Sequence, residues 1–449
     1  MTDSLLAKYD RAVPRYTSYP TAAQFHPGVD AIQVAAWLAA TDPATPLSFY
    51  LHVPFCKQMC WYCGCHTRVA ARYEPVRRFA ERLTEELEQT ARIFGGRRRL
   101  AQIHWGGGTP NMLAPDDFRR LMMAIGHLYD IEPGCEIALE LDPRLMSGDL
   151  LRALRDGGVN RVSLGVQDFD VEVQAAINRV QPYDEVRAAI DALRGIGIGG
   201  LNLDLIYGLP KQTPAGFRQT VELALSLDPD RLAIFGYAHV PWMKAHQRLI
   251  DEATLPDAAQ RFAMAESAAR QLIAAGYRRI GLDHFAKSTD ALALALEDRS
   301  LRRNFQGYTA DPAETLVGFG PSAISALPQG FAQNLAETGA WSQAVAKGHP
   351  AIARGVALTG EDRMLGAIIE RLMCFGEVDF GRVALELGAA GYGFRLERAR
   401  LAPLVADGLA ELRGTHLRVT ERGMPYQRIV AAAFDAYFNS SPARHSRAV

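Results

Sequence analysis

The sequence has little net charge and no long apolar run. Its 49 Lys and Arg residues against 50 Asp and Glu residues leave a formal net charge of −1, so overall charge attracts it neither to nucleic acid nor to a membrane surface. No stretch approaches the roughly 18 apolar residues of a membrane span. The first residues, Met1 to Lys8, lack the apolar core of a secretory signal. We therefore expect a cytoplasmic protein that binds neither nucleic acid nor membrane.

Cysteine is also scarce. The chain has six cysteines, and four of them fall between Cys56 and Cys65. Thiols stay reduced in the cytoplasm, so we expect this cluster to bind a metal rather than to form disulfides. The other two, Cys135 and Cys374, fall in predicted packed elements and are expected to be buried core thiols.

The spacing of the first three clustered cysteines, C-x3-C-x2-C, is informative. It differs from the C-x2-C pairs of structural zinc sites and from the C-x2-C-x2-C run of bacterial ferredoxins. Thiolates from Cys56, Cys60 and Cys63 would hold a cubane iron–sulfur cluster at three corners and leave the fourth iron without a protein ligand. An open coordination position is typical of catalytic metal sites. The spacing therefore predicts a cluster that takes part in chemistry.

A glycine run, Gly106 to Gly108, follows a predicted strand. It matches neither the G-x4-G-K-[ST] pattern nor the G-x-G-x-x-G pattern, so phosphate binding is not indicated. Taken alone, the run is best interpreted as a tight turn. Beside three cysteines, its exposed backbone groups could instead fix a small amino-acid-like ligand.

Short β-rich runs alternate with helical patterns from residue 46 onward, which indicates a parallel sheet. An open doubly wound sheet and an incomplete TIM-like barrel both fit this pattern. Glu140, Gln167 and Asp204 fall near the carboxyl ends of their strands, and this convergence favours a partial (β/α)6 TIM-like barrel in the α/β class. The predicted strands are Leu47–Val53, Ala101–Trp105, Glu136–Asp142, Arg161–Gln167, Leu201–Gly208 and Arg231–Tyr237.

Three regions are expected: an N-terminal extension over the active site (1–45), the barrel (46–350) and a mostly helical C-terminal domain (351–449). In the last region, Thr359 can cap a helix, and Leu396–Leu409 reads as a second helix. A hairpin over 410–419 and a final helix over Met424–Phe438 would complete a winged-helix-like module. Because no basic helix is present, we expect a packing or lid role rather than DNA binding.

Several polar residues are candidates for ligand contacts. Glu140, Gln167, Arg179 and Asp204 could hold ribose hydroxyls, an ammonium and a carboxylate, although a structural ion pair explains each of them equally well. The segment Asp283–Ala286 and the later segment 304–309 combine aromatic and hydrogen-bonding groups. Such a combination is typical of a surface that binds a flat, partly apolar ligand.

The cysteine spacing resembles that of the radical S-adenosylmethionine enzymes. Further motifs resemble the oxygen-independent coproporphyrinogen III oxidase family within that group, from about residue 8 to the C-terminal module. They are Pro14-Arg15-Tyr16-Thr17-Ser18-Tyr19-Pro20-Thr21, Cys65, His104-Trp105-Gly106-Gly107-Gly108-Thr109-Pro110, Asp283-His284-Phe285-Ala286 and Arg303-Asn304-Phe305-Gln306-Gly307-Tyr308.

The resemblance implies a set of cofactors. Cys56, Cys60 and Cys63 would ligate a [4Fe–4S] cluster, and one S-adenosylmethionine would bind its open iron with a second molecule beside it. The positions implied around the first molecule are Tyr50, Gly107, Glu140 and Ile324. Those implied around the second are Tyr62, Gly108, Thr109, Gln167, Arg179, Asp204 and Ala238.

The resemblance also implies a reaction. A 5′-deoxyadenosyl radical would remove hydrogen from two propionates of coproporphyrinogen III, and loss of carbon dioxide would leave the vinyl groups of protoporphyrinogen IX. Cys65 is expected to act near the site, and Arg15 to bind a substrate carboxylate. The expected partner is a low-potential electron donor such as flavodoxin or ferredoxin, and the expected state is a monomer.

Two alternatives remain open at this stage. A haem-chaperone paralogue would share the cysteines and barrel yet move haem without oxidase activity, although such paralogues generally lack Cys65 and the N-terminal stretch. A non-catalytic iron–sulfur electron carrier or DNA-binding regulator would use Cys65 as a fourth cluster ligand.

Overall fold

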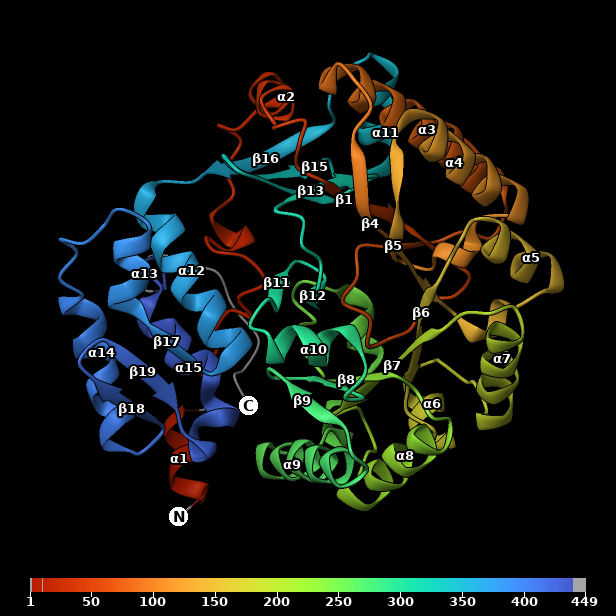
Figure 1. The fold of residues 1–449 in the computed structure, drawn as a ribbon. Coiled ribbons are helices and arrows are strands. Elements are labelled where there is room, and N and C mark those ends of the chain that lie inside the picture. The colour runs from red at the N-terminus through yellow and green to blue at the C-terminus, as the bar shows by residue number, and fades with distance from the viewer. Residues whose placement is uncertain (1, 10, 439–449) are drawn as a thin grey trace.

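The computed structural model describes residues 2–9 and 11–438 and is built around one large sheet (Figure 1). Within the described residues this sheet has twelve strands, in the order β16-β15-β14-β13-β1-β4-β5-β6-β7-β8-β10-β9. All six predicted strands are present and pair in parallel, which confirms the partial α/β barrel. They are β1 (Leu47–Val53), β4 (Arg99–Gly107), β5 (Asp130–Leu141), β6 (Arg161–Gln167), β7 (Gly200–Tyr207) and β8 (Arg231–Gly236).

Further strands extend both edges of this parallel set. On one side β13 (Thr315–Phe319) pairs in parallel with β1, and three antiparallel strands follow. On the other side β10 (His284–Ala286) pairs antiparallel with β8, and β9 (Arg278–Ile280) pairs with β10. The strands that follow β13 are β14 (Ile324–Leu327), β15 (Gly330–Asn334) and β16 (Ile352–Ala357). The sequence analysis missed these edge strands, several of which are too short to show a period.

Helices cover the outer face of the parallel strands (Figure 1). Val76, Leu83 and Leu87 of the first long helix are fully buried and recur at helical spacing, so they form the face that packs on the sheet. The outer helices are α3 (Glu74–Phe94), α4 (Pro115–Leu128), α5 (Gly148–Asp156), α6 (Val171–Ala176), α7 (Tyr183–Gly195), α8 (Pro214–Ser226) and α9 (Ala258–Ala274). On the inner side of the sheet, the residues at the rim are polar.

Smaller elements connect the large ones. Asp30 accepts a hydrogen bond from the Gln33 backbone nitrogen and so caps the helix α2 (Ala31–Ala39). The others are α1 (Thr2–Tyr9), β2 (Phe55–Cys56), β3 (Arg68–Val69), α10 (Ala291–Glu297), β11 (Arg302–Asn304), β12 (Gly307–Thr309) and α11 (Thr338–Ala346). No described helix is both long enough and apolar enough to cross a bilayer.

The C-terminal region matches the predicted module in most respects. Thr359 and Asp362 form a capping box at the start of the first helix, and the predicted hairpin is present with a third strand beside it. Its elements are α12 (Gly360–Phe375), β17 (Glu377–Asp379), α13 (Phe380–Glu386), α14 (Arg395–Ala406), β18 (Ala410–Arg413) and β19 (His416–Val419).

The predicted final helix over Met424–Phe438 is wrong. The chain forms a 3-10 helix over Glu421–Tyr426, the short helix α15 (Gln427–Ala431) and a second 3-10 helix over Ala432–Phe434. Every residue from Ile429 to Phe434 is buried, so this run has no exposed face and its burial does not require one continuous helix. The apolar run on which the prediction of one helix rested is buried, but its backbone forms short 3-10 and α-helical turns.

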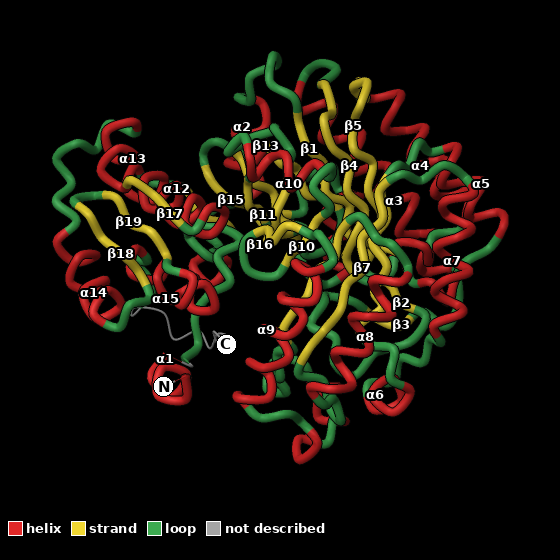
Figure 2. Tube along the Cα trace, turned by 60° about the horizontal axis from the view of Figure 1, so that its bottom comes forward, coloured by secondary structure: helices red, strands yellow, loops and turns green. Residues whose placement is uncertain are grey.

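The N-terminal segment packs against this C-terminal region. Leu5, Tyr9, Val13, Tyr16 and Tyr19 are buried in the same apolar cluster as α12 and α15, which we call the second core. The Tyr16 hydroxyl donates to an Asp435 carboxylate oxygen at 3.0 Å. Figure 2 shows this part of the molecule beside the barrel. The boundaries near residues 45 and 350 stay a prediction, and residues 439–449 lie outside the described residues.

Candidate active site

A cavity of about 500 Å³ lies at the carboxyl ends of the parallel strands. We call it the cysteine cavity. Most of the predicted site residues line it, from segments between residues 15 and 240. They are Arg15, Cys56, Cys60, Tyr62, Cys63, Cys65, Gly107, Gly108, Thr109, Glu140, Gln167, Arg179, Asp204 and Ala238. The predicted positions Tyr50 and Ile324 are not among its lining residues.

The loop that carries the cysteines is held from several sides. The Thr109 hydroxyl donates to the Cys56 sulfur at 3.3 Å, and Arg179 donates to the Cys60 sulfur at 3.6 Å. The backbone nitrogen of Cys65 donates to the Cys63 sulfur at 3.3 Å. Such contacts fix the sulfur atoms without a disulfide, since all six cysteines are free.

The segment after β8 also supports this loop, and the sequence analysis missed it. Lys244 donates to the carbonyl of Cys65 at 2.8 Å, and Gln247 donates to the carbonyl of Tyr62 at 2.8 Å. The His246 ring lies 2.7 Å from the carbonyl oxygen of Cys63. These side chains reach the loop through its backbone carbonyls, so no motif in the sequence marks them.

The donor set suits an iron–sulfur cluster better than a single ion. Among the described residues, no group of three or more His, Cys, Asp or Glu side chains is placed to hold one metal ion. A cubane instead takes its thiolates at separate iron corners, and Cys56, Cys60 and Cys63 line one cavity from one loop. A hydrogen bond from Cys65 lowers the pKa of Cys63 to about 6, which favours the thiolate that binds iron. The three residues therefore fit the implied cluster.

The glycine run owes its composition to close packing. Gly107 has φ +110°, and a Cβ there would lie 2.7 Å from the His52 ring. A Cβ on Gly108 would lie 2.4 Å from the Thr67 hydroxyl and 2.6 Å from the carbonyl oxygen of Phe55. Only glycine therefore lets the end of β4 pass so close to β1 and to the cysteine loop. The backbone of Gly107 and Gly108 lines the cysteine cavity, and the predicted ligand contact requires this.

Glu140 joins this run to the inner strands. Its carboxylate accepts from the Gly107 backbone nitrogen at 3.2 Å and lies 3.3 Å from the His104 ring nitrogen. The Tyr50 ring stacks on the His104 ring with 5.9 Å between the ring centroids, and the Tyr50 hydroxyl lies 3.1 Å from Nδ1 of His52. Tyr50 thus supports the rim of the cavity from beneath, whereas Ile324 belongs to the edge strand β14.

Asp204 is a buried acid in the cavity wall. It accepts hydrogen bonds from Ser163 at 2.9 Å and from Asn202 at 2.8 Å. Burial, together with the nearby charge of Glu140, raises the pKa of Asp204 to about 6. The carboxylate is therefore ionised at neutral pH but close to its titration range.

Arg179 lines the same cavity as Asp204. Its guanidinium donates to the carbonyl of Gly165 at 2.6 Å and lies 3.6 Å from the Asp142 carboxylate. Gln167 next to it has φ +69°, a rare value for a residue with a side chain. Strain of this kind is common at binding sites.

Arg15 lies where two cavities meet. Its guanidinium donates to the carbonyl of Gly236 at 3.2 Å, and it lines both the cysteine cavity and a neighbouring cavity of about 100 Å³. Asp283 from the predicted aromatic segment lines this smaller cavity, whereas Gln306 and Tyr308 line a third cavity that reaches Glu140 and Asp204. The two sequence segments thus flank the site from different sides.

Comparison with known proteins first defines the class. Residues 50–224 match the family model of the radical SAM superfamily, and residues 358–426 match that of the HemN C-terminal domain. The matched ranges contain the cysteine loop and the winged-helix-like module. The fold, the three-cysteine site and these matches define a radical S-adenosylmethionine protein.

The relatives narrow the class. An oxygen-independent coproporphyrinogen III oxidase of Bradyrhizobium diazoefficiens is 47% identical, with 98% of each chain covered, and one of Paracoccus denitrificans is 41% identical, with 99% of this chain and 98% of the relative covered. The structure of the coproporphyrinogen III oxidase HemN from Escherichia coli superposes with a TM-score of 0.91 at 38% identity, covering 97% of this chain and 99% of that one. The chain belongs to the oxygen-independent coproporphyrinogen III oxidase family. The haem-chaperone alternative receives no support from these comparisons.

Proposed function

We propose that this protein oxidatively decarboxylates two propionate side chains of coproporphyrinogen III to vinyl groups, giving protoporphyrinogen IX in anaerobic haem synthesis. One observation carries this proposal. In this member of the family, a single cavity is lined both by three cysteines of one loop and by the polar residues at the strand ends. Each propionate loses a hydrogen atom, an electron and carbon dioxide. No side-chain acid or base can break its unactivated C–H bond, and the cluster with S-adenosylmethionine supplies that step when bound.

The chain's own residues position the cofactors. Cys56, Cys60 and Cys63 would hold the cluster, with Thr109 and Arg179 directing two of the sulfur atoms. The predicted contacts form two sets at the cavity rim, one for each S-adenosylmethionine molecule. Tyr50, Gly107, Glu140 and Ile324 would surround the first, and Tyr62, Gly108, Thr109, Gln167, Arg179, Asp204 and Ala238 the second.

The carboxylates and the cations in the cavity have complementary tasks. Glu140 and Asp204 are suited to an ammonium group or ribose hydroxyls, because both line the cavity and each carboxylate oxygen can accept more than one hydrogen bond. Arg179 is suited to a carboxylate, since its guanidinium is rigidly held by Gly165. Cys65 is proposed as a catalytic residue beside the cluster rather than as a ligand.

An anaerobic product assay tests the proposal. Reconstituted protein is incubated with coproporphyrinogen III, S-adenosylmethionine and a strong reductant, and the tetrapyrroles are separated by chromatography. Formation of protoporphyrinogen IX, dependent on S-adenosylmethionine, is the expected result. Haem binding without vinyl product would instead favour the chaperone class. A flavodoxin-like or ferredoxin-like donor, the monomeric state and the cytoplasmic location stay predictions.

A further inference from the structure

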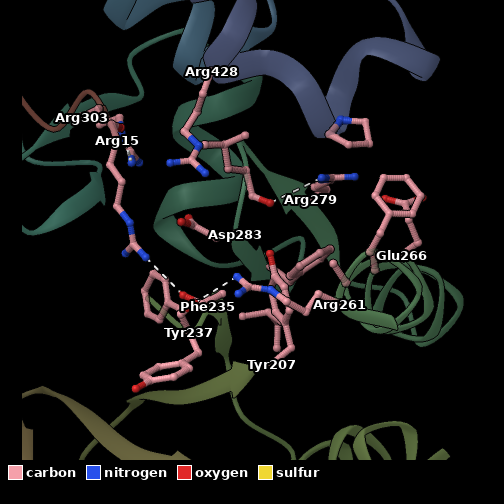
Figure 3. A pocket seen from close by; sticks show the side chains of 18 residues that line it. Arg15, Tyr207, Phe235, Tyr237, Arg261, Glu266, Arg279, Asp283, Arg303 and Arg428 are labelled. Atoms are coloured by element: carbon pink, nitrogen blue, oxygen red, sulfur yellow. Dashed lines mark hydrogen bonds between the residues drawn. The ribbon is translucent and has the colours of Figure 1, made fainter. Parts of the chain in front are cut away.

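Five arginines from distant parts of the chain surround one small cavity, which we call the arginine cavity. They are Arg15, Arg261, Arg279, Arg303 and Arg428. Arg261 comes from α9, Arg279 from β9, Arg303 from β11 and Arg428 from α15. In Figure 3, Arg428 enters from above, Arg15 from the left and Arg261 from below, around Asp283.

Backbone carbonyls hold several of these arginines in place. Arg261 donates to the carbonyl of Tyr237 at 3.0 Å, and Arg279 donates to that of Gly281 at 3.2 Å. Arg303 donates to the carbonyls of Arg15 and Tyr16 at 3.1 and 3.2 Å, and its second terminal nitrogen is buried without a partner among the described residues. For Arg279 and Arg303, these neutral carbonyls orient the guanidinium without balancing its charge.

The cavity carries an excess of positive charge. Asp283 and Glu266 are the acidic residues among those that line it, against five arginines. Asp283 is already engaged by the ring of His284 at 2.7 Å. Burial and the neighbouring charges of Arg15 and Arg303 lower the pKa of Arg428 to about 10, which leaves it protonated at neutral pH. Arg15 is exposed and the other four arginines are partly exposed, and such a concentration of like charge favours the entry of an anion.

The size and position of the cavity restrict that anion. A volume of about 100 Å³ accommodates a carboxylate on a short chain and is much smaller than the adjacent cysteine cavity of about 500 Å³. Arg15, Phe235, Gly236 and Tyr237 line both this cavity and the cysteine cavity, so the two are adjacent. The ligand that fits is a larger molecule with several carboxylate arms, one of which reaches in while another lies in the cysteine cavity.

We propose that the arginine cavity is a carboxylate subsite, which binds a non-reacting propionate of the tetrapyrrole and thereby directs another propionate into the cysteine cavity. The inference rests on the proposed function, since that function supplies a substrate with four propionates. Arginine is suited to this task because its planar fork binds a carboxylate through two hydrogen bonds. The subsite would select for tetrapyrroles that carry carboxylate arms over uncharged ones.

The test compares Arg261→Gln, Arg261→Lys and Arg279→Gln with Arg270→Gln as the matched control. Arg270 is an exposed arginine on the same helix and does not line the cavity. For Arg261→Gln and Arg279→Gln, we expect the KM for coproporphyrinogen III to rise about 10-fold or more, because each loses a charge-assisted hydrogen bond. Arg261→Lys should lie between wild type and Arg261→Gln, and Arg270→Gln should match wild type.

Two further measurements separate binding from folding and from chemistry. Thermal unfolding identifies any variant that fails to fold, and cleavage of S-adenosylmethionine without substrate should be unchanged in the rest. Binding of coproporphyrin III and of its uncharged tetramethyl ester is followed by fluorescence. The acid should lose affinity in the Arg261→Gln and Arg279→Gln variants, whereas the ester should not respond.

The failure of this inference differs from the failure of the proposed function. If wild type makes vinyl product but both glutamine variants keep the wild-type KM and affinity for coproporphyrin III, the arginine cavity is not a carboxylate subsite. If wild type makes no vinyl product, the proposed function is wrong. The comparison of acid and ester would then still decide whether the cavity binds carboxylates.

Discussion

The two adjacent cavities are assembled in different ways. The cysteine cavity takes its proposed cluster ligands from one loop, between Cys56 and Cys63, and many of its other residues from the ends of successive strands. The arginine cavity takes its cations from five segments between Arg15 and Arg428. The first is built by a local motif on a repeated fold. The second exists only where the N-terminal segment and the second core meet the barrel.

This contrast separates chemistry from recognition. A cluster needs thiolates at a fixed mutual spacing, which a short loop provides most reliably. A substrate with several carboxylates needs charges spread over a wide surface, and distant segments provide them better than one motif does. We therefore expect variants of the two cavities to fail in different ways.

The largest effect is expected for Cys60→Ala. Loss of one thiolate should remove the iron–sulfur absorbance and abolish product formation, because the cluster has no spare ligand of the same geometry. Affinity for coproporphyrin III should stay within about 2-fold of wild type, since Cys60 does not line the arginine cavity that is proposed to bind its carboxylate. Absorbance spectroscopy, iron analysis and fluorescence titration measure these three quantities.

Cys65→Ser is the matched control for that variant. It should keep the cluster absorbance yet lose product formation, because Cys65 is assigned to the reaction and not to the iron. Loss of iron in both variants would instead identify Cys65 as a fourth ligand and support the electron-carrier class.

A smaller effect is expected from the protonation of Asp204. Its pKa of about 6 means that the carboxylate is ionised above that pH and protonated below it. If the ionised form holds S-adenosylmethionine, affinity should increase as pH rises from 5 to 7.5, and the Asp204→Asn variant should bind about 10-fold more weakly at pH 7.5. Anaerobic equilibrium dialysis of the reconstituted protein measures this.

The shape of the pH profile decides that prediction. Asp204→Asn should flatten the rise near pH 6 without changing affinity at pH 5, where the wild-type carboxyl group is neutral. Parallel profiles for wild type and variant would remove Asp204 from the cofactor site.

The smallest effect is expected for Tyr16→Phe in the second core. The change removes the hydrogen bond to Asp435, which should lower the free energy of unfolding by about 1–2 kcal/mol. The Tyr16 carbonyl still accepts from Arg303, so the KM for coproporphyrinogen III should rise less than in Arg261→Gln. Guanidinium titration and the product assay measure the two effects. An equal rise in KM would mean that the second core controls the arginine cavity.

Much of the barrel could be predicted from the sequence because its strands are apolar and separated by amphipathic helices. The edge strands β9 and β10 could not, since each has three residues and their pairing depends on long-range contacts. The final helix was wrong for a similar reason. Burial stabilises the apolar side chains after Pro425 whether the backbone forms a helix or a series of turns. Composition alone therefore does not specify a helix.

The site divides along the same line. Cys56, Cys60 and Cys63 could be predicted because their chemistry depends on spacing within one loop. Lys244 and Gln247 could not, because they act on loop carbonyls and any donor in that place would do. Arg261, Arg279 and Arg428 could not be predicted as site residues either. An isolated arginine in a helix or strand is most simply interpreted as a solvated surface charge.

The sequence by itself determined the cluster-binding loop, the alternation of strands and helices, and the glycine run that brings β4 close to that loop. Local spacing and periodicity encode each of these. Only the tertiary structure decided that the N-terminal segment joins the second core, and that Arg15 and Arg428 meet above one cavity next to the cysteines. Charge density at a point in space depends on how distant segments pack, and no local pattern in the chain records it.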